Sequence, residues 1–588
     1  MAPQVLRGLR IALLWMTSPT GIVVLGLLGV LSHRLYFIKG EHHIKAPLYV
    51  TLWTVVTVLI ASVSYVVDWA EHDGSSEAKL GTIRTSVLVN CAFFLPLFAS
   101  VVVYRLFQHA LRDFPGPRLA ASSKLWHFCY MFKTNNYILL ENLRKRYGSI
   151  VRTGPQELTI IHPDILGVIS GHGTPCIKGP VYDMQRPLFV SLNTYRTKEG
   201  YAPRRKRWDD ALGLSAPFIP DKEARVYHFA SLLIHQMKAS AGCPINVTTW
   251  FSHFAFDIMT DLAFGRSFDL TKNLNPSSKL HHAPSLLSRG MSMLRFFMPA
   301  PWIGIFCIKA TPYIPVISRA WNNAVGWAVD MCDVRLDQDK DIDVDHRKDA
   351  FSRFTISAQR DKDEGSLDRF ALYGDAFTFA VAGSHTTSAA LTMLFYELAR
   401  RPELQERARR EATQAGITAA AGDGQLATKN NMATTWENLP FLDGCINETM
   451  RLYPALPTAG IRQTVGKPIK VGETWIPPHT IIVAPRWSIG RLESAFEQPQ
   501  EFIPERWTTK SHMVKNPRAF SPFANGRHTC PGKQLGLLEV RMAAAMILVS
   551  FEFSLDPKRE NQTRVVDQLQ DSFTATPGEL EIMFKKLT

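Results

Sequence analysis

The sequence predicts a mostly α-helical domain with a minor β-sheet, preceded by a membrane anchor of about three transmembrane helices. Three observations lead to this fold class. The 588-residue chain is 46% hydrophobic and 20% charged, a composition typical of a folded protein that excludes a disordered or fibrous one. Long apolar runs fill much of the first hundred residues. Beyond them, long amphipathic segments punctuated by proline and glycine outnumber the short strand-like runs.

The predicted anchor covers residues 1–113, with spans at about 11–31, 47–67 and 86–104. Each run lacks Asp, Glu, Lys and Arg and is long enough to cross a bilayer, which takes about 20 helical residues. Because the runs repeat, we expect a retained anchor rather than a cleaved signal peptide. The alternative is a buried helical hairpin of a soluble domain, which the second and third runs disfavour because they are apolar on all sides.

The charges between the runs predict the orientation of the anchor. Segment 32–46 is basic, segment 68–85 is acidic, and residues 105–124 are basic again. Basic loops stay on the cytosolic side. We therefore expect an odd number of spans in the endoplasmic reticulum membrane, a lumenal N-terminus and a cytosolic domain after residue 113. Sequons that should then stay unglycosylated begin at Asn246, Asn447 and Asn561.

The large domain is predicted to cover residues 114–588. Phe114–Arg118 (FPGPR) forms a stiff breaker that we interpret as a hinge between anchor and domain. Ile150–Thr153 and Leu158–Ile161, separated by Gly-Pro, predict a hairpin. The formal net charge is +14, and residues 1–113 hold nine basic and six acidic side chains, so most of the excess lies on the large domain. It forms either an ordinary solvated surface or a docking face for an acidic partner.

The eight cysteines include no CxxC pair, so neither a zinc cluster nor a disulfide framework is expected and a reducing compartment fits best. By default each is a small buried apolar residue. Cys530 differs because it precedes a helical run from Lys533 to about Ser550, and a helix N-terminus stabilises a thiolate. Gly526 and Gly532 permit close approach to a flat cofactor.

The segment Phe523–Gly532 (FANGRHTCPG) resembles the haem-binding loop of the cytochrome P-450 superfamily. The resemblance implies that the Cys530 thiolate is the axial iron ligand of haem b. It also implies that the other matching positions surround the haem, with the two basic ones meeting its carboxylates. These positions are Phe523, Gly526, Arg527, His528 and Gly532.

A second motif places Glu448 and Arg451 three apart on one helical face, followed by Arg506 in a Pro-Glu-Arg-Trp segment. Alone, the first pair would be read as a surface ion pair. With Arg506 it resembles the buried Glu–Arg–Arg network of the same superfamily, which implies a structural role in fixing the loop that holds Cys530.

A third motif, Ala382–Thr387 (AGSHTT), lies in the helical run Gly374–Ala399 and resembles the superfamily's oxygen-binding helix. The resemblance implies that Gly383 opens room beside the iron and that the Thr386 hydroxyl passes protons. His385 stands where the family usually has an acid. With an unperturbed pKa of about 6.5 it could replace the acid as relay; alternatively it is a hydrogen-bonded core residue or a substrate-pocket residue.

A weaker match is Tyr201–Arg205, which resembles a Trp/His-x-x-x-Arg segment whose arginine binds a haem propionate. This implies that role for Arg205, whereas Tyr201 departs from the pattern. The run Arg204–Arg207, with Lys533 and Arg541, forms either a basic docking face for an electron donor or a plain surface.

The resemblance covers residues 114–588 and implies a membrane-bound, fungal-type haem-thiolate monooxygenase. No flavin or nicotinamide fingerprint is visible, so NADPH electrons are expected through a separate NADPH–cytochrome P-450 reductase, with cytochrome b5 as a further partner and no nucleic acid. A terpenoid, alkaloid or polyketide intermediate of secondary metabolism is the expected hydrophobic substrate. The segments expected to contact it are Leu188–Tyr195, Phe377–Ala382, Leu456–Gly460 and Phe573–Thr576.

Two alternatives belong to other classes. A haem-thiolate isomerase or dehydratase needs no reductase; the missing acid at His385 suggests it, and the intact Thr386 argues against it. A non-enzymatic membrane haem-binding or scaffold protein would keep the anchor and the core but would not need the Gly383-x-x-Thr386-Thr387 pattern.

Overall fold

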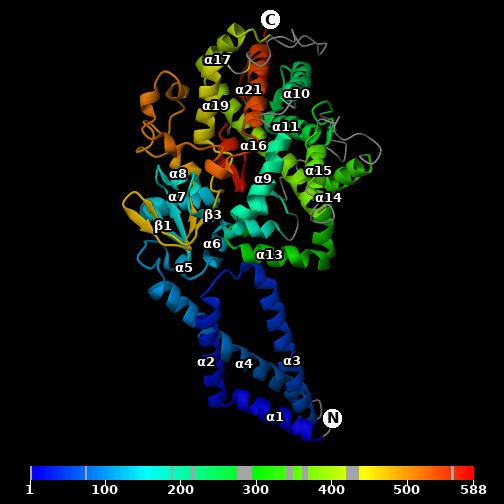
Figure 1. The fold of residues 1–588 in the computed structure, drawn as a ribbon, viewed down its shortest axis with the longest axis vertical. Coiled ribbons are helices and arrows are strands. Elements are labelled where there is room, and N and C mark those ends of the chain that lie inside the picture. Colours follow the sequence, from blue (N-terminus) through cyan, green and yellow to red (C-terminus); the bar gives the residue numbers. More distant parts are fainter. Residues whose placement is uncertain are drawn as a thin grey trace.

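The computed structural model describes residues 3–72, 76–186, 190–212, 219–273, 295–338, 349–360, 369–418, 436, 438–557 and 562–587. The N-terminal helices extend from one end of a large, mainly helical domain (Figure 1). These helices are α1 (Pro3–Thr17), α2 (Pro19–Ser32), α3 (Ala46–His72) and α4 (Ser76–Val103), and short π-helical turns prolong α2 to Phe37 and α4 to Gln108. By length and composition, three stretches could cross a membrane: Pro19–Phe37, His43–Ala70 and Lys79–Gln108.

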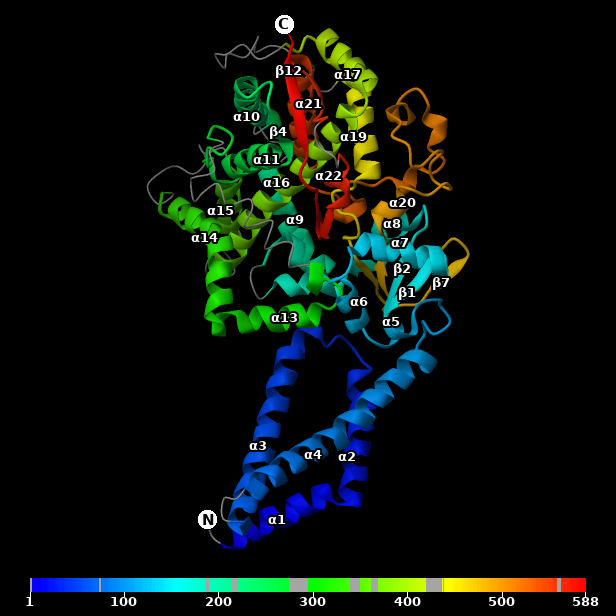
Figure 2. The same cartoon turned by 180° about the vertical axis from the view of Figure 1, so that it is seen from behind.

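The predicted first span at 11–31 is wrong in its position. The helical run is interrupted at Ser18. The side-chain oxygen of Ser18 accepts a hydrogen bond from the Gly21 amide and so caps α2. Proline at the first position of α2 suits a new helix start. Residues before Ser18 therefore belong to α1, which lies across the far end of the anchor (Figure 2).

Small residues let the anchor helices pack closely. A Cβ at Gly29 would clash with the Phe93 carbonyl oxygen of α4, and one at Gly26 would lie 3.2 Å from the Pro96 side chain. The side-chain oxygen of Asn90 accepts a hydrogen bond from Trp53 Nε1 of α3 at 2.8 Å. Helix α4 thus holds both α2 and α3. The α2–α3 loop and the end of α4 lie against the large domain, whereas the end of α3 and the start of α4 lie at the far end (Figures 1 and 2).

The predicted hinge is pinned to the large domain. The Pro115 carbonyl accepts a hydrogen bond from the Arg152 amide at 2.7 Å. A Cβ at Gly116 would clash with the Arg152 carbonyl. The breaker therefore packs on the first strand of the domain instead of leaving anchor and domain free to rotate.

The prediction of a mostly helical domain with a minor sheet is confirmed. Its helices are α5 (Arg118–Ser122), α6 (Leu125–Tyr130), α7 (Asn136–Tyr147), α8 (Ile165–Ser170), α9 (Lys198–Leu212), α10 (Ile219–Ala239), α11 (Val247–Phe264), α13 (Pro301–Ala310), α14 (Pro315–Gln338), α15 (Ala350–Arg360), α16 (Arg369–Ala399), α17 (Pro402–Gln414), α19 (Pro440–Leu452), α20 (Arg486–Ile489), α21 (Lys533–Ser550) and α22 (Arg564–Asp567). The long α16 runs through the centre and packs on α11, α19 and α21 (Figure 1).

The strands are short and lie mostly on one side of the helices. They are β1 (Ile150–Gly154), β2 (Glu157–Ile160), β3 (Cys176–Lys178), β4 (Pro244–Asn246), β5 (Arg462–Thr464), β6 (Ile469–Val471), β7 (Thr474–Ile476), β8 (Ile481–Val483), β9 (Phe551–Leu555), β10 (Gln570–Ser572), β11 (Thr574–Thr576) and β12 (Glu581–Lys586). The largest sheet has the order β1-β2-β8-β5-β3 and is antiparallel except for β2–β8. The predicted hairpin is its β1–β2 pair.

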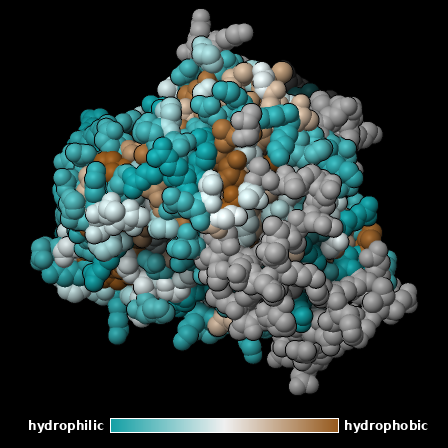
Figure 3. All heavy atoms as spheres, turned by 90° about the horizontal axis from the view of Figure 1, so that it is seen from above, coloured by the Kyte–Doolittle hydropathy of each residue, from teal (hydrophilic) through white to brown (hydrophobic). Residues whose placement is uncertain are grey.

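The end of the domain opposite the anchor is covered mainly by hydrophilic side chains among the residues whose placement is described (Figure 3). Apolar residues, by contrast, line the outside of the anchor; Ile11, Val23, Leu59 and Leu95 are each more than half exposed. Such apolar exposure suits a lipid environment, so the three apolar helices indicate membrane association.

Candidate active site

Cys530 lies in a tightly folded loop directly before α21. Its amide donates to the Phe523 carbonyl at 2.8 Å, and the Thr529 amide donates to the Gly526 carbonyl at 3.1 Å. Helix α21 begins at Lys533 and ends at Ser550, so the predicted helix is confirmed. Burial raises the pKa of the Cys530 thiol, and the Gly532 amide and the Arg205 charge offset this only in part. The predicted stabilisation of a thiolate at the helix start is therefore present but outweighed by burial in the chain alone.

The two glycines of the loop differ in what surrounds them. A Cβ at Gly532 would meet only the Cys530 sulfur, 3.9 Å away, so this side is open to a flat group as predicted. Gly526 has a φ of +63° and a Cβ there would clash with the Ser170 carbonyl. Glycine is thus required at 526 by the backbone turn and by the approach of α8, and these requirements differ from the predicted approach to a cofactor.

Basic side chains from distant parts of the chain gather beside this loop. Their charges lower one another's affinity for protons: the pKa of His528 falls to about 2 through burial and then through Arg462, Lys178, Arg527 and Arg205. Burial, Arg462 and Arg205 also hold the pKa of Lys178 well below its usual value. His528 is therefore neutral near pH 7. We call the basic residues around it, Lys178, Arg205, Arg462 and Arg527, the cation cluster.

Arg205 reaches the Cys530 loop from α9, whereas Arg527 extends from that loop toward the segment before β3. Arg205 donates to the Thr529 carbonyl, and Arg527 donates to the Thr174 carbonyl at 2.8 Å. His528 packs edge-on against Tyr201, with ring centroids 4.5 Å apart. Tyr201, which departs from the family pattern, therefore supports a loop residue through this ring contact.

Lys178 and Arg462 were missed by the sequence analysis. They pair across neighbouring strands β3 and β5 and are 5% and 4% exposed. Nε of Arg462 and Nδ1 of His528 are buried without a hydrogen-bond partner among the described residues. Single basic residues in three-residue strands give no sequence signal; only the strand pairing reveals them.

The cation cluster fits the carboxylate edge of a haem. Buried charges are normally paired, yet the one ion pair of these residues within the described ranges joins Arg205 to Asp209, whose side chain is 52% exposed. Two propionates would supply the missing negative charge. Beside them, the donor set holds a thiol at a helix start, which is suited to iron.

The accessible face of α16 carries Ala382 and Thr386, one turn apart, and the Thr386 hydroxyl donates to the Ala382 carbonyl at 2.8 Å. The Thr387 hydroxyl lies 4.0 Å from the Cβ position of Gly536, on the first turns of α21. The predicted oxygen-binding helix thus lies against the helix that follows Cys530.

Two predictions on α16 need revision. A Cβ at Gly383 would clash with the Met259 sulfur of α11, so this glycine permits close packing of two core helices rather than opening room beside the iron. Burial lowers the pKa of His385 to about 4, and its imidazole is therefore neutral near pH 7. A neutral imidazole can pass a proton only by accepting one at its unprotonated nitrogen and releasing the one on its other nitrogen.

Glu539 on α21 is a further residue that the sequence analysis missed. Both its carboxylate oxygens are buried without a hydrogen bond of normal geometry to the described residues. Burial raises its pKa to about 8 against a smaller opposite effect of the Thr387 hydroxyl, so the group is mostly protonated at pH 7. A protonated acid thus lies beside the proton-relay motif, although no acid occupies position 385.

The Glu448 network has the predicted arrangement. Arg451 and Arg506 donate to Glu448 at 2.8 and 3.0 Å, and all three side chains are fully buried. Trp507, which the sequence analysis had not assigned, also donates to Glu448, at 2.9 Å. The centroid of its ring lies 4.3 Å from that of Phe520, three residues before the Cys530 loop begins at Phe523. We call Glu448, Arg451, Arg506 and Trp507 the closed network.

The predicted docking face is smaller than expected. Arg204 is buried and pairs with Asp375 of α16 at 2.6 Å. Arg541 pairs with Asp443 at 2.5 Å. Lys206 and Lys533 are exposed and remain available to an acidic partner.

The predicted substrate segments are partly brought together. Leu192 donates its amide to Asp375 of α16 at 2.9 Å, and the Ala575 amide donates to the Ala455 carbonyl at 2.8 Å. Phe573, with a φ of 75°, lies edge-on to Tyr182. Leu188 and the residue after it lie outside the described residues.

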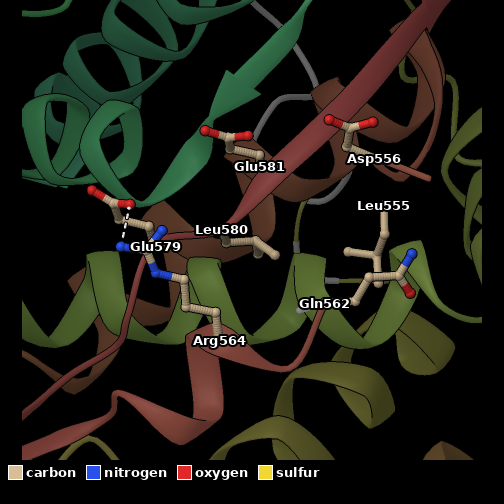
Figure 4. Close-up of a pocket in the computed structure, with 7 residues that line it drawn as sticks. All are labelled: Leu555, Asp556, Gln562, Arg564, Glu579, Leu580 and Glu581. Atoms are coloured by element: carbon tan, nitrogen blue, oxygen red, sulfur yellow. Dashed lines mark ion pairs between the residues drawn. The ribbon is translucent and has the colours of Figure 1, made fainter. Parts of the chain in front are cut away.

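A pocket at the C-terminal sheet is separate from this region. It is lined by Leu555, Asp556, Gln562, Arg564, Glu579, Leu580 and Glu581, and an Arg564–Glu579 ion pair of 3.0 Å closes one side (Figure 4). It contains no residue of the three motifs.

A mostly helical domain with a cysteine loop, a cation cluster and a closed network defines the class of thiolate-ligated haem proteins. Comparison with known proteins agrees: the "Cytochrome P450" family model matches residues 121–584. The chain belongs to the cytochrome P450 family, in which a cysteine thiolate binds the haem iron.

Curated relatives are similar over nearly the whole chain. Cytochrome P450 monooxygenase FCK2 of Fusarium pseudograminearum is 36% identical over 97% of this chain and 98% of its own length. Tryprostatin B 6-hydroxylase of Aspergillus fumigatus is 32% identical over 93% of both chains. Cytochrome P450 monooxygenase notG' of Aspergillus versicolor is 32% identical over 94% and 95%. The protein is a cytochrome P450 monooxygenase, an oxidoreductase.

Proposed function

We propose that this monooxygenase inserts one oxygen atom of dioxygen into a C–H or C=C bond of a hydrophobic secondary-metabolite intermediate, with Cys530 as iron ligand. The observation that carries the proposal is the position of Cys530 just before α21, beside the cation cluster, of which Lys178 and Arg462 are buried. The haem, when bound, supplies the site where dioxygen is reduced and split.

The chain's own residues have separable tasks in this proposal. Arg205, Arg462 and Lys178 would bind the propionates and so hold the haem. The Thr386 hydroxyl, one turn from Ala382 on the accessible face of α16, passes a proton from its Oγ1 or orders a water molecule that does so. The closed network positions the loop through Trp507 and Phe520.

The substrate is proposed from an apolar cluster at two of the predicted substrate segments and from the relatives. Tyr182, Leu456 and Phe573 belong to one apolar cluster, which suits an apolar molecule. Ser572 and Thr574 bury hydroxyl groups without partners among the described residues and could bind its few polar atoms. One relative hydroxylates tryprostatin B by its name, so a fungal terpenoid, alkaloid or polyketide intermediate is proposed here.

Electrons are proposed to come from NADPH through a separate cytochrome P-450 reductase, with cytochrome b5 as a second donor, docking near Lys206 and Lys533. We further propose a multi-pass protein of the endoplasmic reticulum with its large domain in the cytosol. Basic loops at that end support this orientation. Asn246, which caps α11, and Asn447, within α19, should then carry no glycan in cells, and glycan on either would reverse the orientation; Asn561 lies outside the described residues.

The function is tested by expressing the chain beside a reductase and feeding extracts of cells that lack its gene. Mass spectrometry should find a product heavier by one oxygen atom that requires both NADPH and reductase. An isomerised or dehydrated product formed without NADPH would instead identify the reductase-independent alternative.

A further inference from the structure

The loop between α2 and α3 is held to the large domain by an ion-pair network. We call residues 38–45, which include η2 (His43–Lys45), the anchor loop. The Arg196 guanidinium bridges Glu41 of this loop at 2.6 Å and Asp183 of the large domain at 2.5 Å. His43 Nε2 donates to the same Asp183 oxygen at 2.9 Å. The anchor thus contacts the domain through specific charges in addition to the covalent connection.

The network is mostly shielded from water. The side chains of Asp183, His43 and Arg196 are 4%, 10% and 11% exposed, and that of Glu41 is 35% exposed. Burial alone would raise the pKa of both carboxyls, yet hydrogen bonds and charges from Arg196 and His43 bring them below their usual values. Such pairs are screened less than surface pairs.

A metal ion is not needed to explain this cluster. Ligand atoms of Glu41, His43 and Asp183 lie within 4.8 Å of one another, a spacing that a metal could use. However, Arg196 is bonded to both carboxylates and already supplies the positive charge that a metal would bring.

The network continues into the edge of the sheet. Arg196 Nε donates to the Lys178 carbonyl of β3 at 2.9 Å, and its NH2 group donates to Gln463 of β5 at 2.6 Å. Strand β3 is at the edge of the five-stranded sheet. The same two strands carry Lys178 and Arg462 of the cation cluster.

It also continues into the loop that lines the proposed pocket. We call residues 180–186 and 190–197, which include η4 (Pro180–Gln185) and η5 (Leu192–Thr194), the pocket loop. Asp183 and Arg196 lie near its two ends. Lys178 Nζ donates to the Leu192 and Asn193 carbonyls at 2.9 and 3.0 Å. The Leu192 amide is bonded to Asp375 of α16.

We propose that the anchor loop is a positioning element for the pocket loop: Glu41 and His43, through Arg196 and Asp183, hold it in the conformation that receives substrate. The claim that this loop lines a substrate pocket rests on the proposed function. The claim that the anchor loop holds it in place is independent of that function. A simple tether would need no contact with Arg196, because residues 104–118 already join the anchor to the domain.

Hydrogen–deuterium exchange tests the mechanical part on full-length protein in lipid nanodiscs. In Glu41→Gln, amides of the pocket loop such as Leu192, Thr194 and Arg186 should exchange at least about 5-fold faster than in the parent. Lys39→Gln, in the same loop and outside the network, is the matched control and should change nothing. Equal exchange in all proteins, or equal acceleration in the control, overturns the proposal. His43→Gln gives an independent repeat.

Binding of 4-phenylimidazole, followed by the haem absorption spectrum, tests the functional part. The Kd of 4-phenylimidazole should rise about 3- to 10-fold in Arg196→Gln. Adding Glu41→Gln to that variant should change the Kd little, because both substitutions remove the same contact. Additive losses would overturn the coupling. The carbonyl spectrum of each variant should match the parent. If the parent itself lacks a thiolate-type spectrum, the proposed function fails, while the exchange result still decides the positioning role.

Discussion

Two buried groups of basic residues in this protein are built in opposite ways. In the closed network, Arg451 and Arg506 share the Glu448 carboxylate, and their remaining N–H groups bind carbonyls such as those of Gly490 and Glu497. In the cation cluster, Lys178 and Arg462 lie side by side on paired strands with no carboxylate bonded to either within the described residues.

The two arrangements indicate a structural role for the closed network and a ligand-binding role for the cation cluster. A buried charge that has its partners within the chain stabilises the fold, and removing one partner is costly. A buried excess of one sign is unfavourable for the protein alone and becomes favourable with a ligand of the opposite sign. The two groups should therefore respond differently to mutation.

The largest effect is expected in the closed network. Glu448→Gln leaves two buried guanidinium groups without a carboxylate and should lower the free energy of unfolding by about 3–5 kcal/mol. Chemical denaturation followed by circular dichroism measures it. Asp443→Asn, which breaks the more exposed pair with Arg541, should cost less than about 1 kcal/mol. Similar losses in the two variants would refute the distinction.

Glu539 gives a second case of a buried ionisable group that lacks an opposite charge, because it is a buried acid without a basic partner in the described residues. Its pKa is raised to about 8 in the folded state, whereas an unfolded glutamate titrates near about 4.3. The folded state thus binds more protons between these values, and its stability falls as the pH rises, by about 1.4 kcal/mol per pH unit from this group.

Glu539→Gln should remove this slope. The variant should be more stable than the parent at pH 8 and close to it at pH 5, measured by denaturation at each pH. Parallel pH profiles for the two proteins would show that Glu539 is not protonated in the folded state.

Sequence motifs located one part of the site and could not locate the other. Cys530, Glu448, Arg451 and Arg506 were found because motifs fix their local spacing. Lys178 and Arg462 were not, since pairing of β3 with β5 joins them over a long sequence separation. Helix α21 was predicted at its full length, whereas the first span was misplaced because Ser18 ends one apolar helix and caps the next.

Gly383 and Arg204 show a related limit. Both match or adjoin a motif, yet their neighbours are Met259 and Asp375, on helices that only tertiary packing brings close. A motif predicts which residue types occur and leaves open which surface of the helix each one meets.

Removing a basic side chain from the cation cluster should not destabilise the haem-free protein, in contrast to a substitution in the closed network. Arg462→Met removes one of several mutually repelling charges, so haem-free protein should unfold at equal or higher denaturant concentration. Haem should meanwhile dissociate about 10-fold faster, because a charged hydrogen bond to a propionate contributes about 1.5–3 kcal/mol. Haem transfer to apomyoglobin measures the rate. Destabilised haem-free protein with unchanged haem dissociation would assign Arg462 to the fold.

The smallest effect is expected at His385. Because its pKa is lowered to about 4, a role as neutral relay should be independent of pH between 6 and 8. His385→Ala should raise the fraction of NADPH electrons lost to peroxide by a few-fold at saturating substrate, and His385→Asp should restore much of the coupling. Unchanged coupling with weaker substrate binding would place His385 in the substrate pocket.

The most direct measurement of the central claim is the spectrum of the reduced carbonyl complex in two cysteine variants. Cys530 precedes α21 beside the cation cluster, whereas Cys445 is fully buried within α19 and serves as control. Cys530→Ala should lose the thiolate-type spectrum and Cys445→Ala should keep it, with both proteins folded by circular dichroism. A thiolate-type spectrum retained in Cys530→Ala, or lost only in Cys445→Ala, would contradict the assignment of Cys530 as the iron ligand.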